Sequence, residues 1–200
     1  MPLPPDLLLA LISFAFVSSV TPGPNNLMLL ASGVNFGFVR TIPHMLGVAL
    51  GFVLMTVLVG VGLAGLFTTW PPARILLQIA SVGYLLWLAW KIANAAAPDA
   101  AARSRGRPFT FVQAAAFQWV NPKAWSMALT AMALYAPAAD LRSVALVAVV
   151  FGAINLPSVS AWAAMGTALR RFLAHPKRLR AFNVTMALLL VLSLWPVLRG

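Results

Sequence analysis

The chain has 200 residues, of which 62% are hydrophobic and only 8% are charged. Soluble domains are charged at about a quarter of their positions, so this composition indicates an integral membrane protein. The net charge of +11 would suggest a nucleic-acid partner in a soluble protein. Here the basic residues lie mainly in short loops, so we expect contact with anionic lipid and no nucleic acid. The absence of cysteine excludes disulfides and thiolate metal sites.

Six stretches are apolar and long enough to cross a bilayer, which takes about 20 residues per helix. They cover residues 6–30, 43–67, 72–95, 109–135, 142–169 and 181–198. The first is expected to be an uncleaved helix, because no basic residue precedes it. Residues 34–42 are expected to form the first loop, with Pro43 at the start of the second helix, where its missing N–H is harmless. We therefore expect an all-α integral membrane protein with a single membrane domain, 1–200.

Basic residues are distributed unevenly among the connections between these spans. The first, third and fifth loops hold ten of them: Arg40, Lys91, Arg103, Arg105, Arg107, Arg170, Arg171, Lys177, Arg178 and Arg180. The opposite face holds only Arg74, Arg142 and Arg199. Because Lys and Arg favour cytoplasmic loops, the odd-numbered loops are predicted in the cytoplasm and both termini in the periplasm.

The two halves of the chain share spaced features. Thr21-Pro22 is matched one hundred residues later by Asn121-Pro122, Gly51 by Gly152, and Trp90 by Trp195. The halves would cover about 6–97 and 109–198, joined by a basic linker at about 98–108. Three spans per half would insert the second half upside down. We therefore expect two inverted three-helix repeats, a plan common among secondary transporters, with the substrate site between the repeats.

The first and fourth spans contain their own helix breakers. In the first, Pro22 and Pro24 each remove a backbone donor and Gly23 adds freedom, so a break is expected over residues 21–25. The fourth should kink at Asn121 and Pro122. Carbonyls that lose partners in this way are tolerated in hydrocarbon only where they face protein or a wet cavity. A third interruption is expected at Pro157 in the fifth span, where a packing kink is favoured over a functional break.

Lys123 is the only charged residue deep within a predicted span, about 21 Å along its helix at 1.5 Å per residue. A lysine at that depth indicates a functional site, although it could also serve as a structural partner for freed carbonyls. The acids Asp6, Asp99 and Asp140 all lie in loops or at interfaces. A site for a dication or a basic amino acid would normally use carboxylates, so neither is expected as substrate, and no metal or cofactor is expected either.

A small zwitterionic amino acid fits this set of residues better. Its carboxylate could meet Lys123 and helix N-termini, and its ammonium could meet freed carbonyls and side-chain amides. The candidate binding residues are Thr21, Pro22, Gly23, Pro24, Asn25, Asn26, Asn121, Pro122, Lys123 and Asn155.

Two further features bear on coupling and assembly. His44 could titrate, but it follows the helix-start proline and is expected at the cytoplasmic interface, so the carrier of a coupling proton stays unassigned. Gly47 and Gly51 form a GxxxG pattern that permits close helix approach. The sequence does not decide whether this contact lies within one protomer or between protomers of a homo-oligomer.

Three segments together resemble a known family. These are TPGPNN at the end of the first span, GYLLWLAWKI in the third and FQWVNPKAW at the start of the fourth. With the six-span layout they resemble the LysE/RhtB family of amino-acid exporters, and most closely its cysteine and O-acetylserine branch. The resemblance implies export of small neutral amino acids across the bacterial inner membrane, driven by protons. Threonine-like or homoserine-like substrates stay open. Carried over, the motifs point to residues 22–25 and 121–123.

Other classes of membrane protein fit less well. A transmembrane enzyme would need clustered acids, bases or metal ligands, and the chain has two histidines and no acid within a span. A passive channel for small solutes would not need two interrupted helices in matched positions, but it could have them. A structural membrane protein without transport activity is the remaining alternative.

Overall fold

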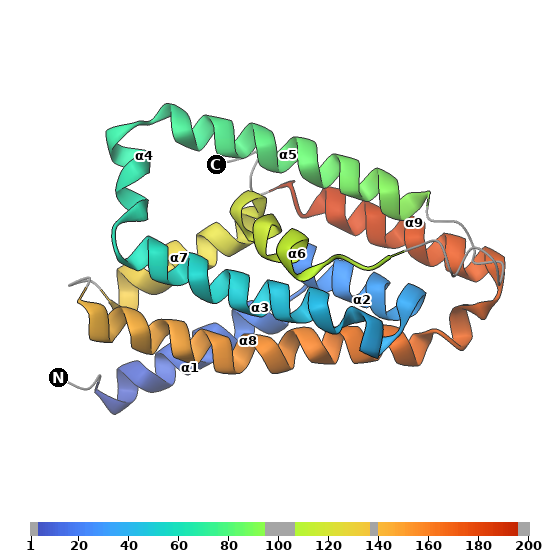
Figure 1. The fold of residues 1–200 in the computed structure, drawn as a ribbon, viewed down its shortest axis with the longest axis horizontal. Helices are drawn as coiled ribbons and strands as arrows, with labels where there is room; N and C mark the ends of the chain where they lie inside the picture. The colour runs from blue at the N-terminus through green and yellow to red at the C-terminus, as the bar shows by residue number, and fades with distance from the viewer. Residues whose placement is uncertain (1–3, 95–106, 137–139, 196–200) are drawn as a thin grey trace.

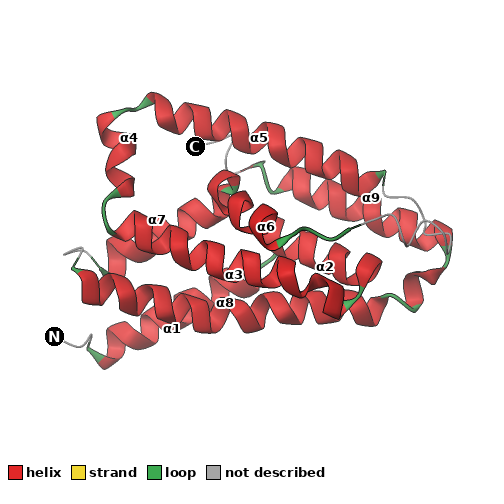
Figure 2. Ribbon diagram, viewed as in Figure 1, coloured by secondary structure: helices red, strands yellow, loops and turns green. Residues whose placement is uncertain are grey.

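The computed structural model describes residues 4–94, 107–136 and 140–195. Across these residues every regular element is a helix, as the composition predicts (Figure 2). The α-helices are α1 (Pro5–Val20), α2 (Pro24–Phe36), α3 (Phe38–Gly60), α4 (Leu66–Thr69), α5 (Pro72–Ala93), α6 (Phe111–Phe117), α7 (Pro122–Tyr135), α8 (Leu141–Leu169) and α9 (Pro176–Leu192). Three short 3-10 turns complete them: η1 (Leu63–Gly65), η2 (Gln118–Val120) and η3 (Phe172–Ala174).

The helices form an elongated bundle in which α3 and α8 run side by side along its length (Figure 1). Both α1 and α2 pack on α8, and α6 packs on α3. Along one edge α5 and α9 run side by side, and α4 links α3 to α5 at one end of the bundle (Figure 1). The broken pairs α1–α2 and α6–α7 are thereby held against the long helices α3 and α8.

Three helices in the described part of the chain are long and apolar enough to cross a membrane on their own: α3, α5 and α8. A fourth crossing is formed by α1 and α2 together if the pair, bent by 51°, counts as one broken span. The remaining long helices, α7 with 14 residues and α9 with 17, are shorter than the about 20 residues that a crossing takes.

Two local expectations are wrong. Residues 34–42 are helical except for Gly37, which has a φ of 81° and joins α2 directly to α3. Pro43 lies inside α3 rather than at its first turn. At Pro157 no functional break occurs, as the favoured interpretation expects: α8 continues through the proline, although it lacks the N–H of an internal helix position. A packing kink there stays a prediction. Single prolines near or within a well-packed helix are accommodated here, whereas clustered breakers are not.

His44 is also placed differently from the expectation of an interfacial residue. It is 2% exposed, its ring lies 5.3 Å from that of Phe109, and neither ring nitrogen has a hydrogen-bond partner. Because α3 begins five residues before Pro43, the histidine falls on an interior face instead of at a helix start.

Glycines set the closest helix crossings. A Cβ at Gly47 would meet the carbonyl oxygen of Phe111, and one at Gly51 would lie 2.6 Å from the Cα of Ala115. The GxxxG pattern therefore serves a contact between α3 and α6 within one protomer. The crossing of α2 with α8 is equally close, since a Cβ at Gly33 would meet the carbonyl oxygen of Ala163.

Candidate functional site

The first break interrupts the helix where the cluster of prolines predicts it. The helix α1 ends at Val20, and α2 begins at Pro24 after three non-helical residues. Gly23 precedes α2 in an extended conformation, with no side chain capping the new helix. The break therefore leaves the carbonyl end of α1 and the N–H end of α2 facing the same region.

Side chains from two other helices, α2 and α8, satisfy the carbonyls that the break leaves free. The carbonyl oxygen of Ser19 accepts hydrogen bonds from Asn26 Nδ2 at 2.8 Å and from Ser158 Oγ at 3.0 Å. The carbonyl oxygen of Val20 accepts one from Trp162 Nε1 at 3.2 Å. Two of these donors lie on α8, so the broken end of α1 is held in place by side chains rather than by a continuing helix.

The second break lies between α6 and α7. After α6 the chain passes through the turn η2 to Asn121, which is in an extended conformation, and α7 begins at Pro122. The Asn121 side chain is 1% exposed, and its Oδ1 accepts a hydrogen bond from the backbone N–H of Lys123 at 3.1 Å. Asn121 is therefore the N-cap of α7, a role that asparagine fills well.

Two sets of hydrogen bonds join the breaks across about one hundred residues of chain. Asn25 Nδ2 donates to Gln118 Oε1 at 2.8 Å, and Gln118 Nε2 donates back to Asn25 Oδ1 at 3.1 Å. Lys123 Nζ donates to the carbonyl oxygen of Thr21 at 2.7 Å and to its Oγ1 at 2.9 Å. The carbonyl oxygen of Pro22 lies 3.4 Å from the same ammonium. The breaks thus form one site.

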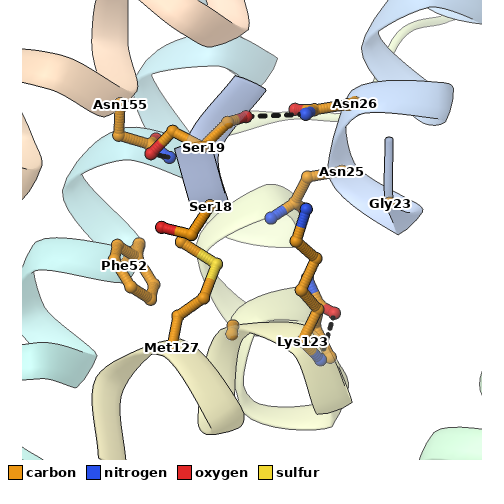
Figure 3. A pocket seen from close by; sticks show the side chains of 11 residues that line it. Ser18, Ser19, Gly23, Asn25, Asn26, Phe52, Lys123, Met127 and Asn155 are labelled. Carbon is orange, nitrogen blue, oxygen red and sulfur yellow. Dashed lines mark hydrogen bonds between the residues drawn. The ribbon is translucent and has the colours of Figure 1, made fainter. Parts of the chain in front are cut away.

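A cavity lies where the breaks meet, with about 330 Å³ of space including its open mouth. Lys123 rises from α7 toward Asn25 and Gly23 on one side of it, and Phe52 and Met127 lie on the other (Figure 3). None of the described lining residues is an Asp or Glu.

Asn155 contributes an unused acceptor to this cavity. Its Nδ2 lies 3.4 Å from Ser19 Oγ, whereas its Oδ1 is buried and has no partner. Unpaired buried polar atoms are uncommon and costly in folded proteins. Among the described residues, this oxygen is an unused acceptor in a side chain that lines the cavity.

The structure brings most of the predicted residues together. The cavity lining includes Gly23, Asn25, Asn26, Asn121, Lys123 and Asn155. Thr21 and Pro22 supply oxygens that accept hydrogen bonds from Lys123. Pro24 and Pro122 are the first residues of α2 and α7.

Sequence reasoning missed several residues at the site. Gln118 is fully buried and pairs with Asn25, and it could have been noticed as a polar residue three positions before Asn121 in an apolar span. Ser19 could have been noticed just before the first break. Phe52 and Met127 could not have been identified from the sequence, because an apolar residue that lines a cavity cannot be distinguished there from any other apolar residue of a membrane helix.

Broken helices that meet at a cavity inside an apolar bundle are typical of membrane transport proteins, in which non-helical backbone is tolerated where it lines such a cavity. Residues 16–193 match the family described as LysE type translocator. The chain belongs to this family, and it is a transporter rather than an enzyme.

Relatives with a described activity extend this comparison. The chain is 34% identical over 190 residues to a cysteine/O-acetylserine efflux protein of Salmonella typhimurium (strain LT2), which covers 94% of this chain and 95% of the relative. It is 32% identical, with the same coverage, to the cysteine/O-acetylserine efflux protein of Escherichia coli (strain K12). No solved structure matches the chain.

Proposed function

We propose that this protein exports small neutral amino acids or their derivatives across the bacterial inner membrane as a secondary transporter. Cysteine and O-acetylserine are the first candidates, because the relatives described above are named for their efflux. Threonine-like and homoserine-like molecules stay open as substrates, because they carry the same amino and carboxylate groups. The amino acid enters from the cytoplasm and leaves on the periplasmic side.

One observation carries this proposal: the two helix breaks meet at a cavity that has a cation and several amides but no carboxylate among its described lining residues. A zwitterion needs a positive partner for its carboxylate, which Lys123 and the uncapped N-terminus of α2 supply. Its amino group needs acceptors, which the carbonyls at the break and Asn155 Oδ1 supply. A cationic substrate would find no charged partner among these residues.

We propose six spans arranged as two inverted repeats, which move by alternating access around this cavity. The packing of the helices supports the repeat. In the first half α1 packs on α8, the central helix of the second half, and in the second half α6 packs on α3, the central helix of the first. The exchange of partners between halves is what a pseudo-two-fold axis in the membrane plane requires.

The proposal includes protons as the coupling ion, anionic lipid at the basic loops and both termini in the periplasm. The orientation is supported by the uneven distribution of Lys and Arg between the two faces. Exposed side chains of the fifth loop, among them Arg171, Lys177 and Arg178, could contact anionic headgroups on the cytoplasmic side.

The test is export from a bacterial strain that lacks its own amino-acid exporters. The wild-type chain is expected to raise the amount of cysteine or O-acetylserine in the medium, and Asn25→Ala and Lys123→Ala are expected to abolish the increase. Asn35→Ala is the control, because Asn35 lies on α2, as Asn25 does, and its side-chain amide donates locally, to the carbonyl oxygen of Ala31 at 2.7 Å. Normal export by both site variants would contradict the assignment of the site. Export that persists down a gradient with an uncoupler present, but never against one, would instead identify a channel.

A further inference from the structure

The ammonium group of Lys123 occupies a set of oxygens that would suit the amino group of a substrate. Three acceptors converge on it at 2.7, 2.9 and 3.4 Å: the carbonyl oxygen of Thr21, the Thr21 hydroxyl oxygen and the carbonyl oxygen of Pro22. All three belong to the non-helical residues between α1 and α2. We call these three oxygens the Thr21 cradle.

The charge of Lys123 explains why its side chain extends from the first turn of α7 to the end of α1. Lys123 lies in the first turn of α7, where the positive end of the helix dipole repels a cation. Its ammonium instead lies beyond the last turn of α1, where the negative end of that helix attracts a cation. The Thr21 cradle is therefore favourable for an ammonium group whichever molecule supplies it.

Gly23 leaves the room that the lysine side chain needs. A Cβ at this position would lie 2.7 Å from Lys123 Cδ and 3.1 Å from its Nζ. Gly23 has an extended backbone with a φ of −175°, which any residue could adopt, so space rather than conformation favours glycine here. The path of the side chain into the Thr21 cradle is thus a specific feature of the break.

We propose that the Thr21 cradle is the subsite for the amino group of the substrate, and that Lys123 fills it as a tethered substitute while the transporter is empty. This inference rests on the transport of a zwitterion proposed above. When the substrate binds, its ammonium replaces that of Lys123 in the Thr21 cradle, and the displaced lysine pairs with the substrate carboxylate. No covalent bond changes, and the net charge of the site is the same before and after the zwitterion binds.

This exchange predicts which molecules can bind. An amine without a carboxylate would displace the lysine and leave its charge unpaired in a half-buried site, which is unfavourable. A carboxylate without an amine would draw the lysine away and leave the Thr21 cradle empty. Only a molecule with both groups satisfies both partners, so the empty wild-type protein selects zwitterions without any acidic residue.

The experiment compares cysteine with cysteamine, which lacks the carboxylate, and with 3-mercaptopropionate, which lacks the amine. Binding to the purified protein in detergent is measured by calorimetry. The wild-type protein is expected to bind cysteine and to bind the other two at least about tenfold more weakly. In Lys123→Met the Thr21 cradle is vacant, so cysteamine is expected to bind at least about tenfold more tightly than it binds the wild type.

Two matched variants test whether the gain comes from the Thr21 cradle. Lys123→Arg keeps a cation there and should gain no affinity for cysteamine. Thr21→Val combined with Lys123→Met removes one of the three acceptors and should lose much of the gain. Wild-type protein that binds cysteamine as well as cysteine would overturn the inference, and this measurement does not depend on the folding of any variant. So would a folded Lys123→Met protein that gains no affinity for cysteamine.

The same measurements separate this inference from the proposed transport. If Lys123→Met gains cysteamine binding but the wild-type chain exports no amino acid from cells, the Thr21 cradle stands and the transport proposal fails. If the wild-type chain exports cysteine but its purified form does not distinguish cysteine from cysteamine, the transport proposal stands and the inference fails.

Discussion

Gln118 is a fully buried residue that depends on a single side chain from the other half of the protein. Its Oε1 accepts from Asn25, while its Nε2 donates both to Asn25 and to the carbonyl oxygen of Ala114 at 2.9 Å. A buried acceptor that loses its only donor costs about 1–3 kcal/mol of stability, more than the hydrogen bond itself contributes. The pair is therefore a structural link between the breaks as well as part of the cavity wall.

We predict that Asn25→Leu and Gln118→Leu are strongly coupled. Asn25→Leu should lower the free energy of unfolding by about 1–3 kcal/mol, because Gln118 Oε1 is left without a donor. The double variant should lose at least about 1 kcal/mol less than the sum of the two single losses, since neither partner is then left unpaired. Denaturant unfolding of the purified proteins in detergent measures the cycle. Additive losses would show that the two amides do not act as a pair.

For His44 we predict no loss of stability on substitution, in contrast to Asn25, because both ring nitrogens of His44 are already buried without partners among the described residues. Replacing an unsatisfied polar group by an apolar one of similar size is close to neutral or stabilising. We therefore expect His44→Leu to unfold at the same temperature as the wild type or at a higher one. His175→Leu, in the exposed N-cap of α9, is the control for adding a leucine. A clear fall in the unfolding temperature of His44→Leu alone would indicate that its nitrogens have partners in the folded protein.

At the scale of helices, α2 and α8 cross with their backbones in close contact. A Cβ at Gly166 would meet the carbonyl oxygen of Leu30, just as one at Gly33 would meet that of Ala163. Backbone atoms cannot move aside as a flexible side chain can, so the two helices would have to separate. Because α8 also supplies the donors that hold the end of α1, a shift at this crossing would reach the cavity.

We predict that Gly33→Ala and Gly166→Ala each destabilise the protein by about 1–3 kcal/mol, the usual cost of overpacking. Gly83→Ala is the matched control, because a Cβ there has no atom within 4 Å and Gly83 lies in the middle of α5. That substitution should be neutral or stabilise by up to about 1 kcal/mol, since alanine has the higher helix propensity. Unfolding of the three variants in detergent provides the comparison. Equal effects at all three positions would contradict the close crossing.

The sequence predicts a helix break correctly where several helix-breaking residues lie close together. Two prolines, a glycine and two amides within six residues predict the first break, and Asn121-Pro122 predicts the second. A single breaker is ambiguous, since Pro157 lies within an unbroken helix and Gly37 alone makes the turn that a nine-residue loop was expected to make. The pairing of Asn25 with Gln118 could not be predicted, because it depends on how two distant helices approach each other rather than on any local pattern.

At the scale of the whole molecule, the long helix α8 runs from one end of the bundle to the other (Figure 1). Its 29 residues span about 43 Å, enough to cross the bilayer and reach beyond it. The short helix α4 lies at one end of the bundle, and the turn between α8 and α9 lies at the other (Figure 1). The basic residues Arg170, Arg171, Lys177 and Arg178 all belong to the second of these ends. The charge distribution therefore predicts that this second end faces the cytoplasm.

The predicted orientation can be tested by labelling single introduced cysteines. The chain has no cysteine, so a single introduced thiol is the only one that a maleimide can label. Thr69 ends α4 and Ala174 ends η3, and both are exposed on the protein at opposite ends of the bundle. With the odd loops in the cytoplasm, a membrane-impermeant maleimide should label Thr69→Cys on intact cells. It should label Ala174→Cys only after the membrane is permeabilised. Export activity of each variant shows that the substitution has not disturbed the fold. The reverse pattern would invert the proposed orientation, and labelling of both thiols on intact cells would contradict the proposed arrangement of the spans.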